Sequence, residues 1–292
     1  MESMIESFNA GTAVCEMSAN DFCRLSEFIH SHYGIKLPDS KKIMLESRLR
    51  KRLYALHMKS YEEYSRYVFS KSGLENELVH MIDLVTTNKT DFYREPMHFD
   101  YLVRKALPEL IRKERTGTAK RLEVWSAGCA TGEEPYTIAM VVNEFFEGFG
   151  EPHERFEILA TDISTKALDV ARMAIYDEER IEPLPNDMKD KYMMRSKDRS
   201  KRLIRITPEL RSRVQFRRLN FMDGDFGISE PMDIIFCRNV LIYFDGKTQE
   251  NLINKFCDYL VHGGYMFVGH SESLSGMNSP LASVAPTIYR KV

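Results

Sequence analysis

The sequence of 292 residues is poor in cysteine, has a single tryptophan and carries no large excess of charge. Its scattered, odd-numbered cysteines are typical of reduced thiols and exclude a disulfide scaffold. No CxxC pair or zinc-type spacing occurs, and His30 and His32 would lie on different faces of a helix, so no metal is expected. A net charge of −2 excludes a broad nucleic-acid-binding surface. The cysteines are Cys15, Cys23, Cys129, Cys237 and Cys257.

Long apolar runs are also missing. None approaches the roughly 20 residues that span a bilayer, and residues 1–17 lack a basic region followed by an apolar one. We therefore expect a cytoplasmic monomer without direct membrane insertion, whose first 17 residues are flexible. An apolar content of 43% is sufficient for the core of one large domain or two moderate ones.

Residues 18–85 have the pattern of a helical domain. Ser18 and Asp21 are spaced as in a capping box, and apolar residues follow at helical intervals. A second helix with a leucine stripe is predicted over residues 40–56, and two shorter helices follow it. No strand-like alternation interrupts the region, so we predict an all-α N-terminal domain.

After a linker and a bridging helix (86–121), the pattern changes to alternating strands and helices over residues 122–292. This alternation predicts an α/β fold with a mostly parallel sheet covered on both faces. The stretch at about 177–213 is too long and polar for a crossover and predicts an inserted subdomain with a helix and a small hairpin. Strands are predicted at 122–127, 156–162, 214–219, 232–237 and 265–269, and helices at 134–147, 164–175 and 246–261.

The most informative stretch is LEVWSAGCATGEEPYTIA, in which a strand leads through Gly128 and Gly132 to Glu133 and Glu134. Two carboxylates at the start of a helix would repel a pyrophosphate. The loop also lacks the third glycine of a dinucleotide fingerprint and the lysine of a P-loop. It favours a cofactor with a positive group and hydroxyls, as in S-adenosylmethionine. The alternative is a loop whose glycines serve only tight packing.

Further polar residues follow other predicted strands, at the edge where open α/β sheets bind ligands. Asp162 is placed to bond ribose hydroxyls, unless it only caps the following helix. The strand MDIIFC delivers Arg238, Asn239 and Tyr243, although Tyr243 could instead pack in the core beside Phe244.

The predicted second helix is strongly basic. Residues 36–59 contain eight basic and two acidic side chains, and Lys41, Arg48 and Arg52 group beside the leucine stripe. Such a run is often only a solvated face. On a nearly neutral protein it also predicts a docking surface for an acidic partner.

The motifs TTNKTDFYRE, VWSAGCATGEEPYTIA, ATDIS, IFCRNVLIYF and GHSES together resemble the bacterial chemotaxis receptor methyltransferases (CheR), which are S-adenosylmethionine-dependent protein-glutamate O-methyltransferases. The resemblance extends from Ser18 to the end of the chain. It implies a helical domain followed by a Rossmann-like methyltransferase sheet with an inserted β-subdomain. It also implies a partner, the cytoplasmic helical region of transmembrane chemoreceptors. Some members hold a receptor peptide at a glycine-bearing hairpin, whereas the corresponding RSKDRSKRLIRI has no glycine.

The resemblance also implies roles for individual residues. Arg94 and Tyr243 would lie at the reaction centre, with Glu133 bound to the cofactor's ammonium and Asp162 to its ribose. Two alternatives remain, a nucleotide-dependent oxidoreductase and a non-catalytic module that binds S-adenosylmethionine. The implied cofactor contacts are Asn88, Thr90, Arg94, Glu133, Asp162, Asn220, Phe221, Asn239 and Val240.

Overall fold

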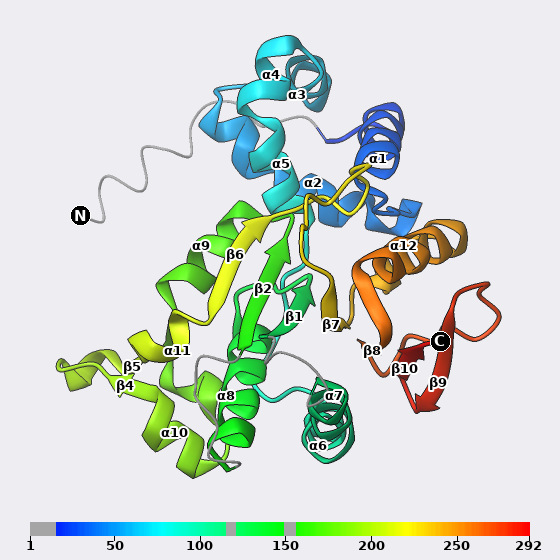
Figure 1. Cartoon of the computed structure of the whole chain (residues 1–292). Helices are drawn as coiled ribbons and strands as arrows, with labels where there is room; N and C mark the ends of the chain where they lie inside the picture. The colour runs from blue at the N-terminus through cyan, green and yellow to red at the C-terminus, as the bar shows by residue number, and fades with distance from the viewer. Residues whose placement is uncertain (1–15, 115–120, 149–155) are drawn as a thin grey trace. The chain divides into compact units, whose positions relative to one another are not determined.

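A computed structural model describes residues 16–114, 121–148 and 156–292 of the chain. Most of the predicted flexible segment 1–17, including Cys15, lies outside these residues. The chain divides into two compact units, Met1–Thr87 and Asn88–Val292 (Figure 1). Among the described helices, none is both long and apolar enough to cross a membrane.

The first unit is helical, as predicted. Ser18 caps the first helix: its hydroxyl accepts the Asp21 amide at 3.0 Å, and the Asp21 carboxylate accepts the Ser18 amide at 3.4 Å, which confirms the capping box. The leucines of the second helix, including Leu45 and Leu49, are fully buried. The helices are α1 (Ala19–Tyr33), α2 (Lys42–Ala55), α3 (Tyr61–Val68), α4 (Lys71–Asn76) and α5 (Leu78–Val85).

The second unit is built on a seven-stranded sheet of order β6-β2-β1-β7-β8-β10-β9. The first five strands in this order are parallel, and β10 and β9 add an antiparallel hairpin at one edge. Helices lie in three of the four connections between successive parallel strands, and only the connection from β6 to β7 has none. The strands are β1 (Leu122–Ala127), β2 (Phe156–Asp162), β6 (Val214–Arg218), β7 (Met232–Cys237), β8 (Leu260–Val268), β9 (Leu281–Ala285) and β10 (Ile288–Lys291).

Successive residues of the central strands point to opposite faces of the sheet and form two cores. Val124 and Ile234 lie in the core shared with α6, α7 and α8, while Trp125 and Ile235 lie in the core shared with α12. Both faces are therefore covered, which explains why these strands read as continuous apolar runs. The helices are α6 (Pro96–Tyr101), α7 (Leu107–Glu114), α8 (Glu133–Gly148), α9 (Thr165–Met173) and α12 (Gly246–Tyr259).

The insertion forms a separate three-stranded antiparallel sheet of order β3-β5-β4. It contains β3 (Ile175–Asp177), α10 (Asn186–Tyr192), β4 (Met193–Arg195) and β5 (Leu203–Ile206), followed by α11 (Pro208–Arg211). Arg202, between β4 and β5, adopts a φ of 43°, a conformation that normally favours glycine. The hairpin thus forms its turn without the glycine that the family resemblance leads one to expect.

Two features of the sheet differ from the prediction. Strand β8 begins at Leu260 rather than 265, because Gly263 and Gly264, which signal a turn, lie inside the strand. Strand β9 was not predicted, since LASVA has too few residues of strong strand preference to stand out.

Candidate active site

The predicted polar residues lie where the parallel strands end, at the carboxyl-terminal side of the sheet. The strand order reverses direction at β1, whose neighbours are β2 and β7, and ligands of open α/β sheets bind at such a switch point. Asp162 ends β2, and Asn220 and Asn239 follow β6 and β7. The carboxyl ends of these parallel strands therefore present the predicted residues on one side.

The loop after β1 is held by backbone hydrogen bonds. The amides of Gly128 and Cys129 both donate to the Thr161 carbonyl, at 2.8 and 2.9 Å. Gly128 and Gly132 have φ angles of 85° and 98°. A Cβ at Gly128 would lie 2.3 Å from the side chain of Val240. Both glycines are thus required for conformation and close packing, and the loop lies against the segment that follows β7.

Asp162 organises this loop. One of its carboxylate oxygens accepts the Ala130 amide at 2.8 Å, and the other accepts the Ser164 amide at 2.9 Å. The capping alternative is wrong, because the hydroxyl of Ser164 caps α9 by accepting the Ala167 amide. Asp162 instead joins the first two strand ends, at the position predicted for ribose recognition.

The two glutamates at the start of α8 contact different partners. Glu133 is fully buried, accepts the Thr131 hydroxyl at 2.6 Å and lies 2.6 Å from a guanidinium nitrogen of Arg180. Glu134 accepts the Ser126 hydroxyl at 2.7 Å and lies 3.4 Å from Arg238. Burial raises the pKa of both carboxyl groups, while these partners oppose the increase. The acidic pair therefore forms two separate sites.

The segment after β7 is shaped by a glutamate that the sequence analysis did not single out. Glu272, from the GHSES motif, accepts the backbone amides of Asn239 and Gly269 at 2.8 and 2.7 Å. It holds Asn239 at a φ of 58°. Tyr243 ends a 3-10 helix (Leu241–Tyr243) and is half-buried, so it is not a core residue.

The segment after β6 completes this edge. Asn220 turns the chain: its side-chain oxygen accepts the Met222 amide at 3.1 Å, and its carbonyl accepts the Asp223 amide at 3.0 Å. The half-buried ring of Phe221 lies 5.4 Å from that of Phe256 in α12. The segment is therefore anchored to the core.

The second half of TTNKTDFYRE is tied through its backbone to α8, to the insertion and to the segment after β7. The Thr90 carbonyl accepts a hydrogen bond from Arg180 at 2.9 Å, and the Tyr93 amide donates to Thr137 of α8 at 3.2 Å. Arg238 donates to the Arg94 carbonyl. These bonds place Thr90 and Arg94 near Glu133 and Glu134, which sequence spacing alone could not show.

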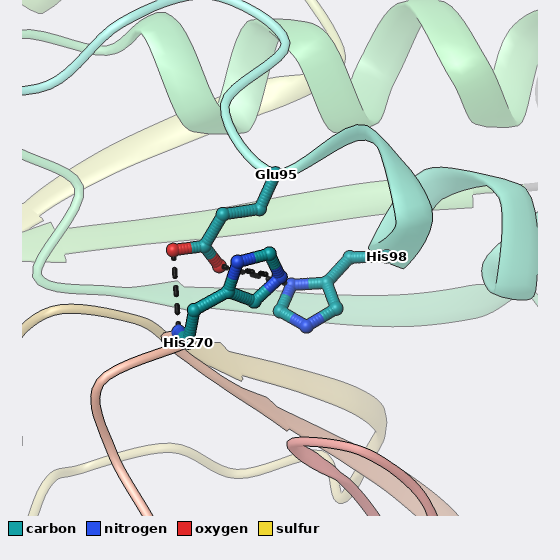
Figure 2. A group of neighbouring side chains, drawn as sticks. All are labelled: Glu95, His98 and His270. Atoms are coloured by element: carbon teal, nitrogen blue, oxygen red, sulfur yellow. Dashed lines mark hydrogen bonds and ion pairs between the residues drawn. The ribbon is translucent and has the colours of Figure 1, made fainter.

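Glu95, the residue after Arg94, is the centre of a charged cluster (Figure 2). Its carboxylate lies 3.1 Å from Arg238 and 3.4 Å from Nδ1 of His98, and it accepts the His270 amide at 3.2 Å. Burial alone would raise the pKa of Glu95, but Arg238 and His270 lower it below its ordinary value. Glu95 has a φ of 58°, so these contacts hold strained backbone next to Arg94.

His98 makes this cluster sensitive to acid. It is fully buried, and its Nε2 is 2.8 Å from the Thr287 hydroxyl. Burial and the nearby Arg238 lower the pKa of His98 to about 4. The folded protein therefore keeps His98 neutral at pH values where an unfolded chain, with a histidine pKa of about 6.5, would protonate it.

We therefore expect His98 to stabilise the fold fully above about pH 6.5 and to lose this contribution as the pH falls toward 4. Between pH 7 and 5 the loss should be about 2 kcal/mol. Denaturant unfolding at several pH values gives the free energy of unfolding of the parent protein and of His98→Gln as a function of pH. The contribution of His98 is the difference between the slopes of these two pH dependences. Parallel pH dependences would contradict the assignment.

Three contributors escaped the sequence analysis, namely Glu95, Glu272 and Arg180. Glu95 and Glu272 lie inside the quoted motifs TTNKTDFYRE and GHSES, but spacing does not show that they accept backbone amides. Arg180 lies in the insertion, which was interpreted only as a subdomain. Glu95, Glu272 and Arg180 each also have a partner more than 30 positions away, namely Arg238, Asn239 and Glu133, and no periodic signal could have identified these pairings.

The fold and this edge of the sheet define a class of protein. An α/β sheet that ends in an antiparallel hairpin and places the buried carboxylates of Glu133 and Asp162 beside a glycine loop disfavours a pyrophosphate. This is the site of an S-adenosylmethionine-dependent methyltransferase.

Comparison with known proteins agrees. Residues 88–289 match the family described as CheR methyltransferase, SAM binding domain, and residues 20–86 match CheR methyltransferase, all-alpha domain. The chain is 41% identical over 275 residues to the chemotaxis protein methyltransferase of Borreliella burgdorferi, which covers 94% of this chain and 95% of that protein. It is 37% identical over 269 residues to chemotaxis protein methyltransferase 2 of Pseudomonas aeruginosa (92% of each).

A third relative, the chemotaxis protein methyltransferase of Escherichia coli, is 35% identical over 273 residues, which cover 94% of this chain and 91% of that protein. The chain therefore belongs to the CheR family of chemotaxis protein methyltransferases. The predicted fold class and the predicted cofactor, S-adenosylmethionine, are confirmed.

Proposed function

We propose that this protein transfers the methyl group of S-adenosylmethionine to glutamate side chains in the cytoplasmic helical region of transmembrane chemoreceptors. It would act as a cytoplasmic monomer in sensory adaptation. The observation that carries the proposal is that both units match CheR, over residues 20–86 and 88–289. The products would be glutamate methyl esters and S-adenosylhomocysteine.

The site residues divide into cofactor and substrate contacts in this proposal. Glu133 would hold the cofactor's ammonium and Asp162 its ribose, because Glu133 begins the helix that follows β1 and Asp162 ends the neighbouring strand β2. Val240 touches the glycine loop, and the rest of the set lies on neighbouring segments. The remaining members of this set are Asn88, Thr90, Arg94, Asn220, Phe221 and Asn239.

The chemistry requires positioning rather than proton transfer. S-adenosylmethionine supplies a methyl group activated by its sulfonium. A glutamate with a pKa of about 4.3 is already ionised at neutral pH, so no general base is needed. Arg94 and Tyr243 would orient the attacking carboxylate and exclude water from it. Binding by Arg94 should not be too tight, because attack neutralises both charges and tight binding would stabilise the ground state.

The direct test is incubation with methyl-labelled cofactor and membranes that contain candidate receptors. We expect label on the receptor that base hydrolysis releases as methanol, which is diagnostic of a methyl ester. A protein that binds the cofactor but transfers no label would be a binding module. Label stable to base would exclude a carboxylate acceptor.

Cofactor recognition gives a separate prediction. Asp162→Ala should weaken binding of S-adenosylhomocysteine by about 1.5–3 kcal/mol, as for a lost hydrogen bond to a charged group. Calorimetry measures this loss, with Asp169→Ala as the matched control, because the Asp169 side chain is exposed on α9. NAD should show no binding to the parent protein. Unchanged affinity in Asp162→Ala would remove the residue from the cofactor site.

The basic helix α2 is the proposed receptor-docking element, and the structure separates its cations into two kinds. Arg48 donates to the carbonyls of residues 84–86 at the end of α5, at 2.7–3.1 Å. Arg52 makes two hydrogen bonds, at 2.8 and 2.7 Å, to the buried Glu77. Of the three predicted docking residues, Lys41 alone has an exposed side chain without a hydrogen bond or ion pair to other described residues.

The side of α2 opposite these arginines fits a helical, acidic partner better. Ile43 and Tyr54 of α2 are 80% and 56% exposed, and eleven residues, close to three turns, separate them. They therefore share one side of the helix. Lys51 is also exposed on α2, and Lys41 precedes it. Apolar anchors flanked by cations suit the exposed side of an acidic receptor helix.

We expect the double substitution Lys41→Glu with Lys51→Glu to lower receptor methylation by about tenfold or more, because it removes charge complementarity. Affinity for S-adenosylhomocysteine and the melting temperature should not change. Lys71→Glu on α4 is the matched control. Arg52→Glu should instead unfold the helical unit, since it faces Glu77. Full methylation by the double variant would show that these lysines are only solvated.

A further inference from the structure

The proposed ammonium partner is inaccessible in the structure. The Glu133 side chain has 0% exposure, with one oxygen bonded to Thr131 and the other 2.6 Å from Arg180. Even a water molecule cannot reach this carboxylate. A ligand's ammonium can therefore contact Glu133 only if a neighbouring side chain moves.

Arg180 is the neighbour that can move. Thr131 is held in its loop, because the Tyr176 hydroxyl donates to its carbonyl at 2.8 Å. Arg180 is 37% exposed and lies in a short 3-10 helix (Glu178–Ile181) of the inserted subdomain. Its arm can rotate into solvent at little packing cost, whereas displacement of Thr131 would break the glycine loop.

The guanidinium also occupies the position that an ammonium would need. The same nitrogen, Nη2, lies 2.6 Å from Glu133 and donates to the Thr90 carbonyl at 2.9 Å. Glu133 and Thr90 both belong to the proposed cofactor contacts. Arg180 thus places a positive charge beside the buried carboxylate and a donor on the Thr90 carbonyl, as an ammonium would, but its N–H groups leave Glu133 Oε1 without a hydrogen bond.

We propose that Arg180 is an internal counter-ion of Glu133 that the ammonium of the cofactor replaces. The exchange keeps the buried carboxylate paired with one cation throughout, which avoids the cost of an isolated buried charge. It also releases the 3-10 helix at 178–181 from the cofactor site. Ligands without an ammonium would leave Arg180 in place. This inference rests on the proposed role of Glu133.

The test is calorimetry of the full chain with two ligands, S-adenosylhomocysteine and methylthioadenosine. The second shares the adenosine and thioether but lacks the amino-acid ammonium and carboxylate. Arg180→Gln should bind S-adenosylhomocysteine about fivefold more tightly, because a competing, partly exposed ion pair is removed. Methylthioadenosine affinity should not change. Arg180→Lys, which keeps the charge, should stay close to the parent protein.

Arg195→Gln is the matched control, because it removes the same charge from an exposed pair with Glu178 in the same subdomain. Hydrogen exchange gives a second readout. S-adenosylhomocysteine should speed exchange of the amides at 178–181 in the parent protein, and these should already exchange faster in Arg180→Gln without ligand.

Two further outcomes separate the hypotheses. Weaker binding of S-adenosylhomocysteine to Arg180→Gln, with methylthioadenosine unchanged, would make Arg180 a direct cofactor contact and overturn the exchange. A parent protein that binds S-adenosylhomocysteine no better than methylthioadenosine would overturn the ammonium role of Glu133 itself.

Discussion

Replacing Arg238 by methionine is expected to lower the free energy of unfolding by about 3–5 kcal/mol, the cost of removing one partner from a buried ion pair. The Arg238 side chain is 1% exposed and lies 3.1 Å from Glu95 and 3.4 Å from Glu134. Its guanidinium also lies 5.6 Å from the centre of the Phe99 ring. Without it, two largely buried carboxylates would share a site with no cation of comparable burial.

Denaturant unfolding measures this effect. Arg290→Met is the matched control, since Arg290 is 31% exposed, pairs with a partly exposed Glu109 and should cost less than about 1 kcal/mol. Adding Glu134→Gln to Arg238→Met should recover part of the loss, because one uncompensated charge is then removed. A loss for Arg238→Met as small as the control's would show that the cluster relaxes or takes up protons.

The second large effect is expected on chemistry. Tyr243→Phe should lower the methylation rate about 100-fold while S-adenosylhomocysteine affinity stays the same, because positioning is needed only when the carboxylate attacks. Arg94→Ala should lower both, since Arg94 is also a proposed cofactor contact. Single-turnover rates and calorimetry separate the two quantities. Equal losses of rate and affinity in Tyr243→Phe would reassign Tyr243 to cofactor binding.

The pH profile of the same reaction tests for a base. We expect no limb with a pKa near 6.5, because the acceptor carboxylate is ionised well below neutral pH. His270 is the candidate for such a base, because it is half exposed and lies 3.9 Å from Glu95. His270→Gln should therefore retain activity. A rate that rises with a pKa near 6.5 and disappears in His270→Gln would contradict the base-free mechanism.

Much of the fold could be predicted because its signals are local. The capping box at Ser18, the leucine stripe of α2 and the apolar runs of β1 and β7 each depend on residues a few positions apart. The glycine loop and its two glutamates likewise identified the cofactor class from sequence, because charge at a helix N-terminus decides which ligands it tolerates.

The structure also corrected how individual charges are interpreted. Arg48 and Arg52 group with Lys41 in the sequence, yet both arginines bond groups of their own domain, the end of α5 and the buried Glu77. A helical wheel gives the direction of a side chain but not what packs against it. The docking role of α2 stays a prediction, and its test moves to the exposed Lys41 and Lys51.

The sequence by itself determined the two-part organisation, the α/β fold class and the chemical character of the cofactor, because these follow from periodicity and from neighbouring charges. Only the tertiary structure decided which charges are paired. Arg180 reaches Glu133, and Arg238 joins Glu95 to Glu134, across 47 to 143 positions of the chain. Burial makes each such pairing energetically necessary, and burial is a property of the folded chain rather than of any short stretch of sequence.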